Sequence, residues 1–409
     1  MPLTVAALAA VGALASYGGT NINPALQYYQ AFLLAPDLPA ADRDYLATNM
    51  WRGQRLPDRF GSLVSRFGNQ FEAVRRAVQA TAPCDWGIDQ SAGPYTLLPQ
   101  LGRVRGVIQN ARLRAMWALQ QGRQADACED LLAGLTLARR ASSDRTLISI
   151  LVQIAGENIV CGAIAENFYQ LNADSLKQLA AGFDAAPPRG TMSTGIAMEK
   201  SLSHDWLKRR IMELQRTNPA PDAATMALLH EVYPDVRDSD GAQETSSTWR
   251  QLNDVTGGSS AGALRLLEEE EPLFDRLAKI AELPVAEYEQ QVTRFAAELR
   301  QSKNPLVAET FPAIEKARPR EFGILAELAM VRAAIEYRLN GPDGLQKVID
   351  PCGSGPFELQ RFVFEGVERG FQLKSAYAGR GFPEVMIFVE RDGPAFNVNG
   401  RNAGKAATQ

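Results

Sequence analysis

The chain has few of the side chains that enzymes and metal sites use most often. Its 409 residues include only two histidines and four cysteines, and no Cys-x-x-Cys pair occurs. No cysteine and histidine spacing suits a zinc site. A nucleophile-elbow serine, a dinucleotide motif and a phosphate-binding loop are also missing. The sequence therefore carries no catalytic signature, and we predict no cofactor and no metal.

An excess of positive charge is missing as well. The chain has 43 basic and 47 acidic residues, which gives a net charge of −4. Proteins that bind nucleic acid normally present a basic face, so we predict no nucleic-acid partner. Apolar residues make up 45% of the chain. That content supports a sizeable core, in one large helical array or in two or three domains.

The four cysteines are far apart in the sequence, at Cys84, Cys128, Cys161 and Cys352. If the protein is exported, they allow one or two disulfides, and four thiols can pair in three ways. The alternative is that they serve as small buried hydrophobic side chains. The sequence leaves both possibilities open.

The first 16 residues are mainly apolar and carry no charge. This run has the length of a signal-peptide core, and Ala13-Leu14-Ala15 fits a small-x-small cleavage site. No lysine or arginine precedes it, and a spanning helix needs about 20 apolar residues. We predict an export signal or a membrane-anchor remnant over 1–17, in a periplasmic or inner-membrane-anchored protein. A buried first helix is the alternative.

Apolar residues recur at helical spacing through most of the chain. The predicted segments are a helical domain over 20–217, a long loop or linker over 218–261 that contains one helix at 223–232, and a helical continuation over 262–340. The clearest unit is a pair of helices around Gly122, where small residues such as Gly134 permit close approach, as in a tetratricopeptide hairpin. No 34-residue recurrence follows, so we predict an irregular array of helical hairpins.

The segment Thr146–Ala165 is almost entirely apolar and is long enough to span a bilayer. Gln153, Glu157 and Asn158 lie near its middle, where lipid would make them costly. We therefore predict a central helix of the protein that is buried on most sides.

The hydrophobic period changes from about 3.6 to about 2 after a long helix that ends at Gly341-Pro342. Strand-like alternation follows over 357–364, 371–376 and 385–389. We predict a small α+β module over 341–396, with about three antiparallel strands packed on the preceding helix. The tail 397–409 is predicted to be disordered.

The loop from Pro83 to Pro99 gathers acidic and aromatic residues beside glycine. Such a loop either lines a ligand site or plugs a helical array while its carboxylates cap helix ends. The interaction surface predicted from these residues and from one tryptophan of the following helix consists of Asp85, Trp86, Asp89, Tyr95 and Trp117.

The alternative to an interaction protein is a hydrolase or a metal-dependent enzyme. Its candidate residues are Glu199, His204, His230 and Glu231, because carboxylates and imidazoles on helices bind metals or transfer protons. Glu199 and His204 are five residues apart, which fits one helical face poorly, and the adjacent His230 and Glu231 diverge. Solvated or structural roles explain these residues better.

The last 85 residues or so resemble the soluble part of type II secretion major pseudopilins. The matching positions are Tyr337, Gly341, Asp350, Pro351, Gly353, Pro356 and Phe357. Cys352 stands where that family has an aromatic residue, and the segment 378–382, which corresponds to its calcium loop, has no aspartate. The resemblance implies a helix followed by a small sheet. It does not imply calcium binding or assembly into a pilus.

Most of the chain also resembles a group of bacterial envelope proteins of planctomycete type. The residues that carry this resemblance are Asn23, Tyr28, Asp85-Trp86-Gly87, Leu98-Pro99, Leu101, Arg105, Asp130-Leu131-Leu132 and Asn304-Pro305-Leu306. The resemblance implies export to the envelope and no particular activity. With the helical grooves expected here, it favours a scaffold or protein-binding component of the cell envelope, with a protein partner and a possible N-terminal membrane anchor.

Overall fold

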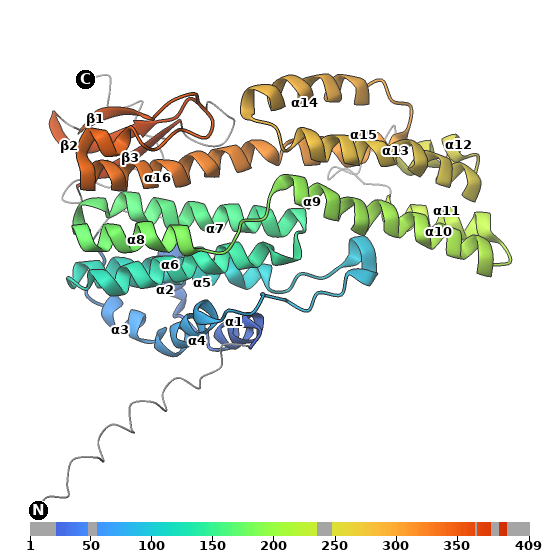
Figure 1. Ribbon diagram of the computed structural model, residues 1–409. Helices are drawn as coiled ribbons and strands as arrows, with labels where there is room; N and C mark the ends of the chain where they lie inside the picture. The colour runs from blue at the N-terminus through green and yellow to red at the C-terminus, as the bar shows by residue number, and fades with distance from the viewer. Residues whose placement is uncertain (1–21, 48–54, 235–247, 365, 378–383, 391–409) are drawn as a thin grey trace, which may run out of the picture.

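The computed structural model describes residues 22–47, 55–234, 248–364, 366–377 and 384–390. The predicted export segment 1–17, the predicted tail 397–409 and the loop 378–382 lie outside these residues. Within the described part the chain forms sixteen α-helices and three strands (Figure 1). A mainly α fold with a small C-terminal α+β module is therefore confirmed.

In the first half of the chain, the described residues form helices and loops and no strand. Its helices are α1 (Pro24–Leu33), α2 (Ala40–Ala47), α3 (Phe60–Ser65), α4 (Gly68–Gln79), the 3-10 helix η1 (Gln90–Tyr95), α5 (Leu101–Gln120), α6 (Gln124–Ala141), α7 (Leu147–Glu166), α8 (Ala173–Ala185), α9 (Met192–Glu199), the π-helical turn η4 (Lys200–Asp205) and α10 (Trp206–Thr217). Short 3-10 turns at Ser142–Asp144 and Phe168–Gln170 flank α7.

The second half ends in the small sheet. Its elements are α11 (Pro221–Val232), α12 (Thr248–Thr256), α13 (Ser260–Ile280), α14 (Val285–Leu299), α15 (Pro305–Glu315), α16 (Arg318–Leu345), β1 (Glu358–Phe364), β2 (Val367–Lys374) and β3 (Val385–Val389).

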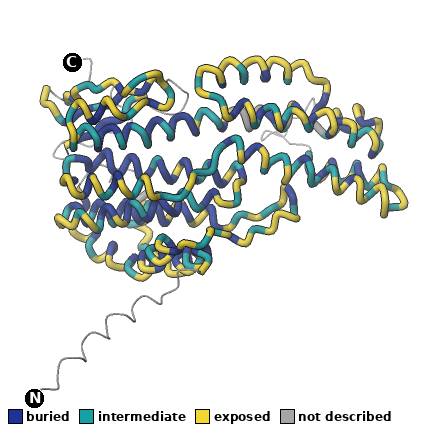
Figure 2. The backbone as a smooth tube through the Cα atoms, viewed as in Figure 1, coloured by how far each residue is buried: buried dark blue, intermediate teal, exposed yellow. Residues whose placement is uncertain are grey.

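The helices are stacked in layers with α5, α6 and α7 at the centre (Figure 1). The helices α1 to α4 cover one side of this centre, and α16 with the sheet covers the other. Buried side chains of all these layers form a single hydrophobic cluster from Ala25 to Val389. Figure 2 shows that burial is densest along the central helices. This cluster joins the N-terminal helices, the central helices and the C-terminal module.

The predicted hairpin is formed by α5 and α6. Gly122 adopts a positive φ of 73° at the turn between them, a conformation that glycine adopts without strain. A Cβ atom on Gly134 would lie 3.4 Å from the Cβ of Ala111 and 3.5 Å from Cγ2 of Val160. These are ordinary van der Waals distances, so the close packing of the three helices depends instead on Gly156 of α7. A Cβ atom there would lie 2.6 Å from Cδ1 of Ile108 on α5 and 2.7 Å from Cβ of Ala138 on α6.

The apolar segment near residue 150 forms α7, which lies at the centre of the body and is buried along most of its length. This confirms the predicted central helix. By length and composition, α7 is the one helix in the described part that qualifies to cross a membrane, and 67% of its most apolar window is buried inside the protein.

The polar residues of α7 have buried partners. Glu157 is fully buried, and it accepts hydrogen bonds from Arg139 Nε at 3.1 Å and from Arg189 Nη2 at 2.8 Å. Arg189 also faces Glu321 of α16 at 3.9 Å, and Arg318 pairs with the same carboxylate. These ion pairs connect α6, α7, the loop before α9 and α16. Removing one partner of such a buried pair is strongly destabilising.

The segment 218–261 contains more helix than the sequence predicts. α11 matches the predicted helix at 223–232, but α12 and the start of α13 also lie in this range. Leu229, Leu252 and Leu266 are buried in a second, smaller hydrophobic cluster formed with α10. The segment has few large apolar residues, so its sequence resembles a loop. The few that it has meet those of α10 and α13 and form an arm that extends from the body (Figure 1).

The C-terminal module contains the predicted three antiparallel strands, and their order in the sheet is β1-β2-β3. The helix α16 breaks at Gly341, where φ is 67° and ψ is −156°. Phe371 of β2 stacks on Phe388 of β3 at 5.0 Å and meets Tyr337 of α16 at 5.1 Å, so the sheet is packed on the preceding helix. Asp350 is buried and accepts a hydrogen bond from Ser375 Oγ at 2.8 Å, which fixes the loop before β1.

All four cysteines are free thiols. Cys128 and Cys161 are buried inside helices, and Cys84 and Cys352 are partly buried in loops. Burial raises the pKa of each thiol, which disfavours the reactive thiolate. Cys128 and Cys161 are therefore small buried hydrophobic side chains, the second of the two possibilities that the sequence leaves open, whereas Cys84 and Cys352 are partly exposed.

Candidate functional site

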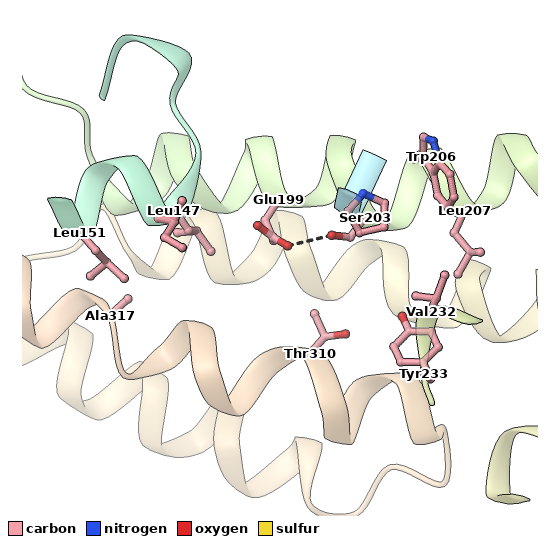
Figure 3. A pocket seen from close by; sticks show the side chains of 12 residues that line it. Leu147, Leu151, Glu199, Ser203, Trp206, Leu207, Val232, Tyr233, Thr310 and Ala317 are labelled. Atoms are coloured by element: carbon pink, nitrogen blue, oxygen red, sulfur yellow. Dashed lines mark hydrogen bonds between the residues drawn. The ribbon is translucent and has the colours of Figure 1, made fainter. Parts of the chain in front are cut away.

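A pocket of about 470 Å³ lies where the arm joins the body (Figure 3). Its walls come from α7, from the η1 loop, from the continuous helix α9-η4-α10, from the end of α11 and from α15. The lining is mainly apolar, and its aliphatic members include Leu147, Ile148, Leu151, Leu207 and Val232. This volume and composition are typical of ligand sites, which combine apolar walls with a few polar groups.

The polar groups of one wall come from the continuous helix α9-η4-α10. Glu199, Ser203 and Trp206 are spaced by four and three residues, so they lie on one side of this helix, and Leu207 also lines the pocket. Ser203 Oγ donates a hydrogen bond of 2.8 Å to Glu199 Oε1. The turn from Lys200 to Asp205 is π-helical, and such turns often mark functional sites.

The opposite wall contributes Thr310 of α15, which faces Glu199 and Ser203 across the cavity (Figure 3). The Thr310 side chain is hydrogen-bonded to Glu270 of α13. Glu270 is 2% exposed, and its Oε1 atom has no hydrogen-bond partner. Burial raises the pKa of Glu270, although the Thr310 hydrogen bond and the nearby His204 oppose this effect. A second carboxyl group thus lies behind the polar wall.

The η1 loop closes one end of the pocket against Trp206. Gly93 has a positive φ of 62°, and a Cβ atom there would lie 2.3 Å from Cγ of Trp206. Only glycine allows this approach. Trp206 Nε1 donates to the Ser91 carbonyl at 2.9 Å, and Tyr95 packs edge-on against the indole at 6.0 Å. Partial burial and the neighbouring Glu231 raise the pKa of Tyr95.

Trp86 of the predicted interaction surface is a core residue. It is 4% exposed, stacks on Tyr28 at 5.7 Å and on Phe32 at 6.1 Å, and donates from Nε1 to the Arg140 carbonyl at 2.8 Å. Asp85 is paired with Asn23, whose Nδ2 donates to the Asp85 carbonyl at 2.6 Å. This part of the loop therefore plugs the helical array, the second of the two roles that the sequence allows.

The remaining residues of that surface lie apart from one another. Asp89 is exposed and caps η1 by accepting a hydrogen bond of 2.9 Å from the Ser91 backbone N–H. That hydrogen bond and one from the Ser91 side chain lower the pKa of Asp89. Trp117 packs on α3, since a Cβ atom on Gly61 would lie 2.7 Å from its ring. Only Tyr95, 44% exposed, lies beside the pocket.

The four candidate enzyme residues do not converge. Glu199 lines the pocket, whereas the His230 ring packs on Trp249 at 4.9 Å. Glu231 interacts with Tyr95 at the rim. His204 is buried, with Nε2 at 2.9 Å from the Leu267 carbonyl and Nδ1 at 2.9 Å from Asp205 Oδ1. A carbonyl only accepts hydrogen bonds, so Nε2 carries a proton and has no lone pair for a metal or a substrate.

Among the residues that the structure describes, no group of three or more His, Cys, Asp or Glu side chains is placed to hold a metal ion. The Ser203 hydroxyl donates to a carboxylate, and no histidine accepts its proton. The usual arrangement for activating a serine requires such a base within hydrogen-bond distance.

Sequence reasoning identified Glu199 and Tyr95 and missed Ser203, Trp206 and Thr310. The spacing of Glu199, Ser203 and Trp206 along one helix was a usable signal, because it predicts a shared face. Thr310 gave no such signal, since its role depends on a contact between α13 and α15.

No protein-family model, no curated protein and no solved structure matches the chain.

Proposed function

We propose that this protein is a scaffold or binding protein of the cell envelope, and that its pocket receives an apolar segment of a partner protein. The observation that supports the proposal most is the open, mainly apolar pocket between arm and body. Ile148 of its lining is 55% exposed, and the exposed Tyr95 extends this apolar surface beyond the pocket. Apolar surface around a concave site is typical of places where proteins meet.

The chemistry of the site favours binding over catalysis. The Ser203 hydroxyl donates to a carboxylate, and the ring of His204 is directed away from the pocket, toward a backbone carbonyl. Helical grooves hold partner segments through apolar anchors. A pocket with walls from five segments of the chain is fixed by the surrounding core, so it costs little to organise on binding.

A photo-crosslinking residue at position 148 tests the proposal in living cells. We expect a discrete protein adduct, because this exposed lining position lies where the partner would contact the pocket. The matched control is the same residue at position 212, since Met212 is also 55% exposed but belongs to α10 outside the lining.

The adduct must also depend on the pocket. Ser203→Phe adds bulk to the wall, and we expect it to abolish crosslinking from position 148 while the circular dichroism spectrum is unchanged. Equal adducts from positions 148 and 212, or an adduct that persists in Ser203→Phe, would show that the partner does not enter the pocket.

The envelope location is part of the same proposal. It is supported by the uncharged apolar run of the first 16 residues. We expect Leu8→Arg, which places a charge inside this run, to retain the protein in the cytoplasmic fraction. Recovery of the unsubstituted protein from the cytoplasm, with an intact N-terminus, would refute export.

A further inference from the structure

The charge of the pocket comes from a single carboxylate. Among the lining residues that the structure describes, only Glu199 bears a formal charge. Ser203 occupies one of its oxygen atoms, and no other described side chain donates to this carboxylate. In Figure 3 the carboxylate lies midway along the cavity, between the leucines of α7 and the rings of Trp206 and Tyr233. Glu199 therefore has acceptor capacity left for a ligand.

The cations near this wall do not neutralise Glu199. Lys200 Nζ lies 3.0 Å from Asp275 and 3.5 Å from Glu271. Lys208 Nζ lies 3.0 Å from the same Glu271. His204 is directed to Asp205 and to a backbone carbonyl. Lys200, Lys208 and His204 thus already have partners outside the pocket.

A second carboxyl group lies behind the facing wall. Glu270 is bonded to Thr310, which lines the pocket, and one of its buried oxygens has no partner. Glu231 at the Tyr95 rim adds a third acidic group. Glu199 is therefore the one charged group of the described lining, and the other two carboxyl groups lie behind Thr310 and beside Tyr95.

The apolar walls specify the rest of the ligand. Leu147, Leu151 and Leu207 suit an aliphatic or aromatic body, and the faces of Trp206 and Tyr233 attract a cation electrostatically. An anionic ligand would meet Glu199 without any compensating lysine or arginine in the lining. Charge complementarity of this kind selects between partners.

We infer that the pocket selects a cationic group on an apolar body, as in a lysine or arginine beside an apolar residue of the partner segment. This inference rests on the proposed function and specifies the chemistry of the partner. The ammonium or guanidinium group would donate to the free oxygen of Glu199, while the apolar body occupies the space between α7 and Trp206.

Three probes of nearly equal shape test the charge preference on the full-length protein. They are phenylbutylamine, phenylbutanol and phenylbutyrate, and their affinities are measured by isothermal titration calorimetry. We expect the amine to bind about ten-fold more tightly than the alcohol, because charge-assisted hydrogen bonds are roughly twice as strong as neutral ones. The carboxylate should bind more weakly than both.

Glu199→Gln should reduce the affinity for the amine to that for the alcohol. Glu213→Gln is the control, because Glu213 is an exposed acidic residue of α10 that pairs with Arg210 outside the pocket. It should leave all three affinities unchanged. Ser203→Ala keeps the carboxylate and should keep the preference for the amine. Equal binding of the three probes, no binding of any probe, or an unchanged preference in Glu199→Gln would overturn the inference.

A peptide experiment distinguishes a protein segment from a small molecule as the source of the cation. Acetyl-Leu-Phe-Lys-amide is compared with its norleucine counterpart and with the free amine. Tighter binding of the lysine peptide supports a protein segment as ligand, whereas tighter binding of the free amine supports a small cationic molecule. Crosslinking at position 148 is independent of charge. If crosslinking is observed but the amine is not preferred, only this inference is refuted. If the amine is preferred but no crosslinking is observed, the proposed protein partner is refuted.

Discussion

Glu327 provides a direct test of the buried polar core, because burial changes its ionisation. Its side chain is 1% exposed, and Asn158 Nδ2 of α7 donates to its two carboxylate oxygens at 2.7 and 3.0 Å. Burial raises the pKa of Glu327 from 4.5 to about 8, although the Asn158 hydrogen bond opposes this shift. The folded protein therefore holds Glu327 as a neutral acid at pH 7.

The sign of the effect on stability follows from linkage. In the unfolded chain Glu327 ionises near its ordinary pKa of 4.5, whereas in the folded chain it ionises near 8. As the pH rises between these values, ionisation of Glu327 stabilises only the unfolded state. The free energy of unfolding therefore falls by about 1.4 kcal/mol for each pH unit. The stability associated with the neutral carboxyl is complete below pH 4.5 and is lost progressively up to about pH 8. At pH 7 the loss is about 3 kcal/mol.

Glu327→Gln keeps the shape of the side chain and removes its ionisation. We expect this variant to raise the free energy of unfolding by about 2 kcal/mol at pH 7, after about 1 kcal/mol is subtracted for a less favourable hydrogen bond with Asn158. At pH 5 the two proteins should differ by less than about 1 kcal/mol.

Urea unfolding followed by circular dichroism at pH 5, 6, 7 and 8 measures these differences. Glu336→Gln is the control on the same helix, since Glu336 is less buried and lies 3.5 Å from Arg332. Such a pair contributes less than about 1 kcal/mol. Parallel stability curves for wild type and Glu327→Gln across this pH range, or a less stable Glu327→Gln at pH 7, would refute the reasoning.

Three further predictions concern the η1 loop, the aromatic plug and the buried ion pairs. Gly93→Ala should displace the loop and weaken crosslinking from the pocket, whereas Gly87→Ala, at a similar positive φ of 67° but with no atom within 4 Å, should only lower the thermal midpoint slightly. Trp86→Ala should lower the free energy of unfolding by about 3–5 kcal/mol in urea titrations, and a loss below 1 kcal/mol would mean that the ring is not a core residue. Arg189→Met should lower the free energy of unfolding by about 3 kcal/mol in the same assay, because it removes one partner of the buried Glu157 carboxylate. Arg123→Met removes an exposed ion pair and should lower it by less than about 1 kcal/mol.

Several features followed from local sequence alone. The change of hydrophobic period near Gly341 located both the end of the long helix and the three strands, because alternation of period 2 is a property of each strand by itself. The small residues around Gly122 and Gly134 located the hairpin of α5 and α6, since the turn between the helices requires the positive φ that Gly122 adopts.

Features that depend on distant partners could not be predicted in this way. The sequence of α7 did not indicate that Glu157 would accept buried hydrogen bonds from Arg139 and Arg189. Nor did it indicate that Asn158 would donate to Glu327 of α16. The sequence of 218–261 gave no sign of α12, whose few apolar residues are buried only against other helices of the arm. Helix formation there is stabilised by tertiary packing more than by propensity.

The sequence by itself determined most of the helices and the three strands, and which face of each is apolar. The tertiary structure alone decided that Pro94, Leu147, Glu199, Val232 and Thr310 line one pocket. The first and last of these residues are more than two hundred positions apart, and no periodicity acts over such distances. Their proximity results from the way in which α7, the continuous helix α9-η4-α10 and α15 pack together, which depends on the fit of all the side chains in the core.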